Sequence, residues 1–258
     1  MRRLPCEELP DVSVPETDLA NKLAYYLLKG VNKAVRDYQM IAHGDRIAVA
    51  VSGGKDSWTL FRLLRLRQAS VPEKYQIVPI HVAMQSSDGA SCTEWEMPRA
   101  QATGFAVEDS ARPLEVVDIG AQPDCFRCSH QRRKALFAAA ERLGCNKVAL
   151  GHHADDAAQT TLLNLIFHGR VETLSPRRSF FDGRLVLIRP MIYLQEKEIV
   201  RFARACAFPL LSSRCPHGLS SRRRMMKDMI RALEKEYPRV KINLFRAGLL
   251  GGQAPDVP

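Results

Sequence analysis

The chain has 258 residues, of which 46% are hydrophobic, and this is enough for an α/β domain of ordinary size with terminal additions. No stretch approaches the about 18 uninterrupted apolar residues of a membrane span, and no apolar signal-peptide core precedes Asp11 and Glu16. Lys and Arg outnumber Asp and Glu by 38 to 28, so the net charge of +10 favours a polyanionic partner. We therefore expect a globular, cytoplasmic protein with no membrane partner.

The hydrophobic pattern alternates between strand and helix along most of the chain. Helical spacing predicts helices at 17–41, 58–68, 129–143, 154–167, 196–206 and 220–237, and short apolar runs predict strands at 46–51, 76–82, 114–118, 147–150 and 184–189. We expect Ser129 to be the N-cap of its helix, a loop from Gln85 to Pro98, and a frayed or disordered tail from Gly248. The alternation predicts an α/β fold with a doubly wound, mainly parallel sheet, which binds ligands at the carboxyl ends of its strands.

A glycine-rich segment, Ser52-Gly53-Gly54-Lys55-Asp56-Ser57, joins the first predicted strand to the next helix. Its glycines remove side-chain bulk where backbone amides can approach a phosphate, and the positive end of the helix points to the same place. The Walker A pattern is not met, because Val49 stands where glycine is needed and Asp56 follows the lysine. The segment resembles the phosphate loop of the PP-loop family of ATP pyrophosphatases, which has an adenine nucleotide alpha hydrolase-like fold. The resemblance implies cleavage between the α and β phosphates of ATP, with transfer of AMP to a substrate oxygen.

The seven cysteines are an odd number, which argues against a disulfide framework and favours reduced thiols or metal ligation. Two residues separate Cys125 from Cys128, so their thiolates can bind one metal from a tight turn between the third predicted strand and a helix. A zinc site, a dithiol redox pair and two unconnected cysteines are the alternatives. A zinc site would draw its further ligands from Cys215, His130 and His217.

A second strand-to-helix junction has the sequence Gly151-His152-His153-Ala154-Asp155-Asp156, and Arg189-Pro190 and Cys215 follow it. At this point the chain resembles the tRNA 2-thiocytidine synthetase family, from about Arg46 to Tyr237. The resembling segments are SGGKDS, CFRCSHQRRK, CNKVALGHHADDAAQ, LIRPM and EKEIVRFARACAFP.

This resemblance implies a [4Fe-4S] cluster on three cysteines, Cys125, Cys128 and Cys215, with a fourth iron that holds sulfide for transfer. Cys125 and Cys128 thereby count among the catalytic residues. Arg132 lies one helical turn past Cys128, and by resemblance it steadies the sulfur or the adenylate. A solvated basic face that includes the next two residues is the alternative for Arg132.

The resemblance also implies an adenine pocket formed by backbone near Val82 to Met84 and by Gly151. It places Asp56 and the catalytic Asp156 near Mg²⁺ and the polyphosphate, while Asp155 is expected to shape the start of its helix. The predicted ATP-binding residues are Ser52, Gly53, Gly54, Lys55, Asp56, Ser57, Val82, Met84, Gly151 and His152.

Basic side chains are candidates for contacts to tRNA phosphates, which give affinity without sequence information. They are Arg177, Arg178, Arg222, Arg223, Arg224, Lys227 and Arg231. A solvated helix face accounts for any one of them equally well. Trp95, Phe180 and Tyr193 are candidates for stacking an extruded base.

We therefore predict an ATP-dependent tRNA sulfurtransferase that adenylates the C2 oxygen of a cytidine, at position 32 as the family implies, and replaces it with cluster-bound sulfur. Its expected cofactors are ATP, Mg²⁺ and the [4Fe-4S] cluster. Its expected partners are tRNA, a sulfur donor such as a cysteine desulfurase, and a second copy in a homodimer. The predicted parts are an N-terminal helical extension (1–43), the PP-loop ATP-binding and sulfur-transfer domain (44–215) and a basic C-terminal helix and tail (216–258).

Two other functions remain open from the sequence. One is a PP-loop enzyme that acts on a different acceptor, either another tRNA base or a small molecule that receives sulfur. The other is a non-catalytic regulatory protein that binds ATP or AMP and docks through its basic surface.

Overall fold

The computed structural model describes residues 18–84, 115–119, 125–208 and 222–251. Its helices are α1 (Asp18–Asp37), α2 (Lys55–Ser70), α4 (Cys125–Arg142), α5 (Ala154–His168), α6 (Glu196–Ala205), α7 (Arg222–Glu236) and α8 (Val240–Gly251). Its strands are β1 (Arg46–Ala50), β2 (Gln76–Met84), β3 (Glu115–Ile119), β4 (Lys147–Ala149), β5 (Arg177–Phe180) and β6 (Leu185–Ile188). The predicted loop from Gln85 to Pro98, Trp95 and Cys215 lie outside the described residues.

The six strands form one sheet in the order β3-β2-β1-β4-β6-β5. Every pair from β3 to β6 is parallel, and only β5 runs antiparallel to its neighbour. Chain order reverses between β1 and β4, where ligands of such sheets bind. The predicted doubly wound, mainly parallel sheet is confirmed.

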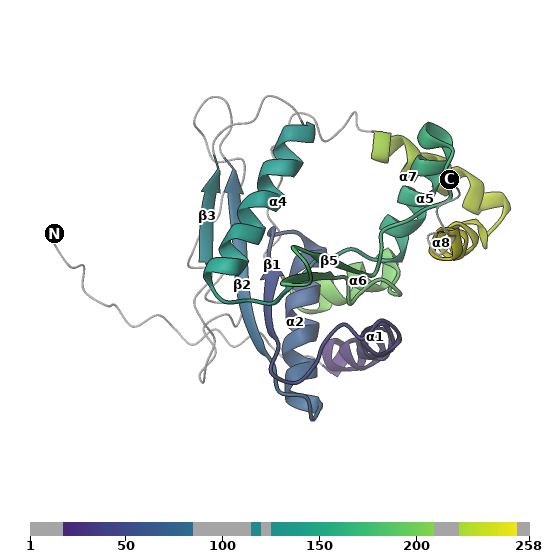
Figure 1. Cartoon of the computed structure of the whole chain (residues 1–258). Helices are drawn as coiled ribbons and strands as arrows, with labels where there is room; N and C mark the ends of the chain where they lie inside the picture. Colours follow the sequence, from purple (N-terminus) through teal and green to yellow (C-terminus); the bar gives the residue numbers. More distant parts are fainter. Residues whose placement is uncertain (1–17, 85–114, 120–124, 209–221, 252–258) are drawn as a thin grey trace, which may run out of the picture.

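Alternate residues of the strands pack against helices on opposite faces of the sheet, as the period of two requires. Ile47 and Ile188 belong to the core with α1, α2 and α6, whereas Ala48 and Leu187 face the core with α4. Figure 1 shows α4 on one side of the sheet and α1, α2 and α6 on the other. Both faces are therefore covered, which explains the continuous apolar runs of β1 and β6.

The two C-terminal helices pack beside α5 and away from the main sheet layers (Figure 1). Their small core joins Ala158 and Leu162 of α5 to Met226 and Ile230 of α7, with side chains of α8 against it. None of the helices in the described part of the chain is long and apolar enough to cross a membrane.

Two helices begin earlier than the sequence pattern predicts. Helix α2 begins at Lys55, three residues before the expected start, so the lysine of the glycine-rich loop is already helical. Helix α4 begins at Cys125, and the prediction that Ser129 is its N-cap is wrong. The residues before Trp58 in α2 are polar and have no apolar period, and the same holds for most residues before Ala135 in α4, so the pattern could not place these starts.

Strand β5 was missed, although it pairs with β6 in a hairpin. Its residues are mostly exposed, so it has no apolar alternation to reveal it. The turn offers a better signal, because Phe181, Asp182 and Gly183 all adopt positive φ angles of 54°, 55° and 86°. An Asp-Gly pair before an apolar run is a known hairpin signal.

The expected frayed tail from Gly248 is wrong for residues 248–251, which form the end of α8. Gly248 is buried, and a Cβ there would lie 2.7 Å from Thr173 Cβ and would also overlap Thr161. Gly251 likewise lies against the backbone of Val171. These glycines permit close packing of α8, whereas the glycine-rich composition of the tail had suggested disorder.

This packing predicts that Gly248→Leu destabilises the protein. Overpacking against Thr161 and Thr173 should lower the free energy of unfolding by about 1–3 kcal/mol, which exceeds the gain of up to ~1 kcal/mol from removing a helix glycine. Urea denaturation would measure it, with Ala247→Leu at the exposed neighbouring position as the control. Equal midpoints for the two variants would contradict the close contact of α8 with α5.

Candidate active site

The segment between β1 and α2 forms a loop whose backbone is open to an anion. Gly53 has φ +84°, a conformation that side chains disfavour, and Gly54 is the extended N-cap of α2 without a side-chain hydrogen bond. The first N–H groups of a helix have no partner within the helix and lie at its positive end. The loop therefore presents backbone donors to a phosphate.

The hydroxyl of Ser57 holds this loop from within. Its Oγ accepts a hydrogen bond from Ser52 N at 3.1 Å and donates one to Gly54 O at 2.8 Å. The residue is only 5% exposed. Ser57 thus stabilises the loop from inside, and its predicted contact with ATP stays a prediction.

Lys55 lies in an ion-pair chain that leads from the loop to α7. Its Nζ is 3.0 Å from Asp56 Oδ2 and 3.3 Å from Glu196 Oε1, and Glu196 Oε1 is 2.8 Å from Lys227 Nζ. Burial disfavours the charged form of Lys55, but the ion pairs with Asp56 and Glu196 outweigh this effect and raise the pKa of Lys55. In the same way Lys227 and Lys55 lower the pKa of Glu196 to about 2 despite its burial.

The second junction, after β4, lies directly against the loop. A Cβ on Gly151 would lie 3.1 Å from the carbonyl oxygen of Asp56 and 3.2 Å from Ser57 N. The carboxyl end of β2 is close as well, because Val51 N, just after β1, donates a hydrogen bond to Ile80 O at 2.8 Å, two residues before Val82. Adjacent parallel strands β2, β1 and β4 thus bring the predicted ATP-binding segments together.

His153 is buried between carboxylates of both junctions. Its Nε2 is 3.6 Å from Asp56 Oδ1 and 3.4 Å from Asp156 Oδ2, and its Nδ1 is 3.7 Å from Asp155 Oδ2. Asp156 Oδ2 also accepts a hydrogen bond from His153 N at 3.1 Å and so caps α5. Asp155, which was expected to shape the start of this helix, lies in its first turn beside Asp156.

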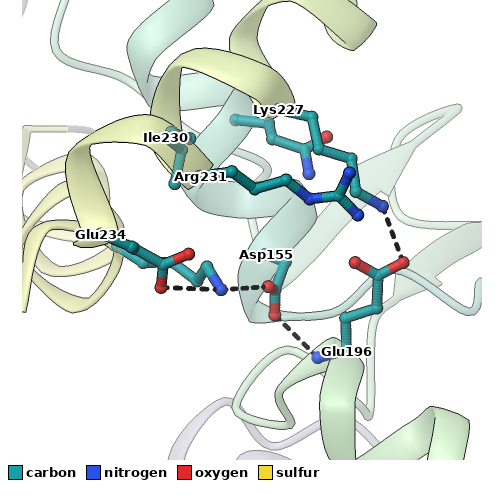
Figure 2. Close-up of a pocket in the computed structure, with 8 residues that line it drawn as sticks. Asp155, Glu196, Lys227, Ile230, Arg231 and Glu234 are labelled. Carbon is teal, nitrogen blue, oxygen red and sulfur yellow. Dashed lines mark hydrogen bonds and ion pairs between the residues drawn. The ribbon is translucent and has the colours of Figure 1, made fainter. Parts of the chain in front are cut away.

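Asp155 links α5 to two other helices. Its Oδ2 accepts a hydrogen bond from Glu196 N at 2.8 Å, at the start of α6, and its Oδ1 pairs with Lys241 Nζ of α8 at 2.8 Å. Lys241 also pairs with Glu234 of α7 at 2.9 Å. Figure 2 shows these groups around a small charged pocket between α5, α6 and α7. The ion pairs of Lys241 with Asp155 and Glu234 therefore connect the C-terminal helices to the start of α5.

His152 pairs with an arginine at the end of β6. Arg189 Nε donates to His152 Nδ1 at 3.2 Å, and the same guanidinium donates to the carbonyl of Ser175. Burial, with the positive charges of Arg189 and Arg223, lowers the pKa of His152 to about 3. The imidazole is therefore neutral near neutral pH, and because Nδ1 accepts, Nε2 bears the proton and can donate.

The cysteine pair lies in the first turn of α4. Cys125 and Cys128 are three positions apart, which places them on one helix face, and Cys128 is half-buried. Arg132, one turn further on, is exposed. The side chains of Cys125 and Met84 are outside the described residues, as is Cys215. Within the part that is described, no three His, Cys, Asp or Glu side chains form a metal-binding group.

Some residues of the site were given no role from the sequence. Glu196 and Arg189 were recognised only within longer segments, yet they contact Lys55 and His152. Their positions could have indicated a role, because Arg189 follows a buried strand and Glu196 begins a helix, and ligands of such folds bind at the ends of strands. The hydroxyl of Tyr193 donates to Asp37 at 3.0 Å and its ring packs against Phe245, while its role in stacking a base stays a prediction.

Comparisons with known proteins agree with this geometry. Residues 27–211 match the family model of the PP-loop domain, which implies ATP binding. A tRNA-cytidine(32) 2-sulfurtransferase of Geobacter sulfurreducens is 38% identical over 245 residues, which cover 92% of this chain and 94% of that protein. The protein of the same name in Geobacter metallireducens is 37% identical and covers 84% and 86%, respectively.

A solved structure shares the fold. The U34-tRNA thiolase NcsA from Methanococcus maripaludis, solved with its [4Fe-4S] cluster, superposes with a TM-score of 0.69 at 22% identity, covering 91% of this chain and 80% of that one. The family match spans most of the chain, and so do the two relatives. The chain therefore belongs to the PP-loop family and, within it, to the tRNA-cytidine(32) 2-sulfurtransferase family.

Proposed function

We propose that this protein thiolates C2 of cytidine 32 in tRNA at the expense of ATP. The C2 oxygen attacks the α phosphate, pyrophosphate leaves, and a sulfur nucleophile then displaces AMP from C2. The observation that supports it best is the contact of the phosphate loop with the Gly151 junction, in a chain whose relatives have this activity in their names.

In this proposal the phosphates of ATP bind at the backbone amides of Gly54 and the first turn of α2, with Lys55 beside them. Glu196 and Asp56 hold the Lys55 ammonium until a phosphate competes for it. His152 donates from Nε2 as a neutral group. Ser52, Gly53 and Ser57 complete the ATP-binding loop, and the Ser57 hydroxyl also holds its backbone. The backbone of Val82, Met84 and Gly151 forms the adenine pocket.

Asp56 and Asp156 are the proposed positions for Mg²⁺. Both carboxylates approach the same nitrogen of His153, one from each junction. Among the described residues Asp56 Oδ1 is buried without a hydrogen-bond donor. Carboxylate oxygens beside a polyphosphate are the ligands that Mg²⁺ prefers, so a cation there would satisfy this oxygen.

Cys125, Cys128 and Cys215 are the proposed ligands of a [4Fe-4S] cluster. The spacing of the first two on one face of α4 suits two bonds to one cluster. When bound, the cluster supplies an iron with an open coordination position for the transferred sulfur. Arg132, on the next turn of α4, is the proposed group that steadies the sulfur or the adenylate.

The remaining expectations are part of the same proposal. The substrate is tRNA, sulfur comes from a donor such as a cysteine desulfurase, and the enzyme works in the cytoplasm, in a homodimer as for its family. The net charge of +10 favours the RNA partner.

Replacing the loop lysine tests the nucleotide site. Lys55→Met should weaken binding of a non-hydrolysable ATP analogue about 10-fold or more, because a charge-assisted hydrogen bond contributes about 1.5–3 kcal/mol. Calorimetry would measure it, with Lys235→Met on the exposed face of α7 as the control. Unchanged affinity in Lys55→Met would place the phosphates elsewhere.

Iron analysis tests the cluster ligands. Protein purified without oxygen should contain about four irons and four sulfides per chain, and Cys125→Ala, Cys128→Ala and Cys215→Ala should each lose most of them. Cys145→Ala, at a buried position just past the C-terminal end of α4, is the matched control. Zinc in the wild type, or iron that survives all three replacements, would rule out this ligand set.

A further inference from the structure

Four arginines from four elements converge on one place next to the nucleotide site. Arg189 follows β6, Arg133 is on α4, Arg178 is on β5 and Arg223 is on α7. The pairing of β5 with β6 sets Arg178 opposite Leu187, which belongs to the core formed with α4, the helix that carries Arg133. Burial, together with the charges of Arg133, Arg178 and Arg223, lowers the pKa of Arg189 to about 10. Asp156 is the acid that opposes them there. The cluster is therefore strongly electropositive.

These cations are not balanced by the protein in the way that other arginines are. Arg224 pairs with Asp228 at 3.0 Å and Arg184 with Glu141 at 3.6 Å. Across the described ranges, no carboxylate forms an ion pair with Arg133, Arg178 or Arg223, although all three are exposed. Like charges held together without counterions raise the free energy of the folded state, and a bound anion removes this cost.

The centre of the cluster is held rigidly. The guanidinium of Arg189 is fixed by His152 Nδ1 on one side and by the Ser175 carbonyl on the other. A guanidinium has five N–H donors, so further donors remain for a ligand. The neutral His152 adds a donor at Nε2. Fixed donors surrounded by exposed arginines form a site for a tetrahedral oxyanion.

We propose that Arg133, Arg178, Arg189 and Arg223 bind a backbone phosphate of the substrate RNA, beside the nucleotide that is modified. This proposal rests on the proposed function. From the sequence, Arg178 and Arg223 were separate candidates for contacts to tRNA phosphates, and here they belong to one site. It gives the RNA a fixed position, because phosphate contacts set register and orientation.

The arrangement favours an RNA phosphate over the polyphosphate of ATP. The ATP phosphates already have the loop amides and Lys55, whereas three of these arginines come from an edge strand, from α4 and from α7. Their exposure leaves room for a polymer. Arg133 is also on the helix that carries Cys128, about 7.5 Å further along its axis.

The test is binding of an anticodon stem-loop RNA with cytidine at position 32, measured by fluorescence anisotropy over a salt series. Arg178→Gln and Arg223→Gln should each weaken binding about 3- to 10-fold and reduce the slope of log K against log salt by about 1. The controls are Arg184→Gln in the same hairpin, whose charge Glu141 already neutralises, and Lys235→Gln on α7. Both should bind within about 2-fold of the wild type.

A parallel titration with an ATP analogue identifies the anion. Unchanged ATP affinity in Arg178→Gln and Arg223→Gln supports the RNA phosphate, whereas weaker ATP binding with normal RNA binding would assign the cluster to the polyphosphate. Equal losses in all four variants would indicate a diffuse basic surface and overturn the site. Wild-type protein that binds no stem-loop would refute the proposed function itself, and melting temperatures would show that each variant is folded.

Discussion

The close approach of two strand-to-helix junctions determines the geometry of this active site. Because β1 and β4 are parallel neighbours, the phosphate loop and the Gly151 junction leave the sheet at the same edge. The contact is tight enough that even a Cβ on Gly151 would lie 3.1 Å from the backbone of Asp56. The helix N-termini of α2 and α5 therefore meet, and two positive ends favour a polyanion between them.

Charge pairs connect this centre to the C-terminal helices. Lys55, Glu196 and Lys227 form one chain from the phosphate loop to α7, and Asp155 and Lys241 form another from α5 to α8. The apolar core of α5, α7 and α8 holds the same helices in place. A phosphate bound at Lys55, as we propose, would compete with Glu196, which also contacts Lys227 of α7.

The sequence predicted the parts of the fold that have a strong local signal. Strands β1 and β6 are buried on both faces, which requires continuous apolar runs, and the glycine-rich loop needs Gly53 for its positive φ. Strand β5 and helix α8 had no such signal. The first is an exposed edge strand, and in the second glycine serves close packing against Thr161, which depends on a partner 87 residues earlier in the chain.

The same distinction applies to the site. The phosphate loop and the Gly151 junction are contiguous motifs, so their residues could be named in advance. Glu196, Arg189 and the arginines around His152 come together only through tertiary packing. The role of Asp156 as the cap of α5 depends on side-chain direction, which the sequence does not determine.

We propose that this chain adenylates and then thiolates a cytidine of tRNA. The most direct measurement is nucleoside mass spectrometry of unmodified tRNA after incubation with the protein, ATP, Mg²⁺ and sulfide without oxygen. We expect 2-thiocytidine at position 32, formed together with AMP and pyrophosphate and absent without ATP. Pyrophosphate release with no sulfur in the RNA, or sulfur in a uridine, would contradict it.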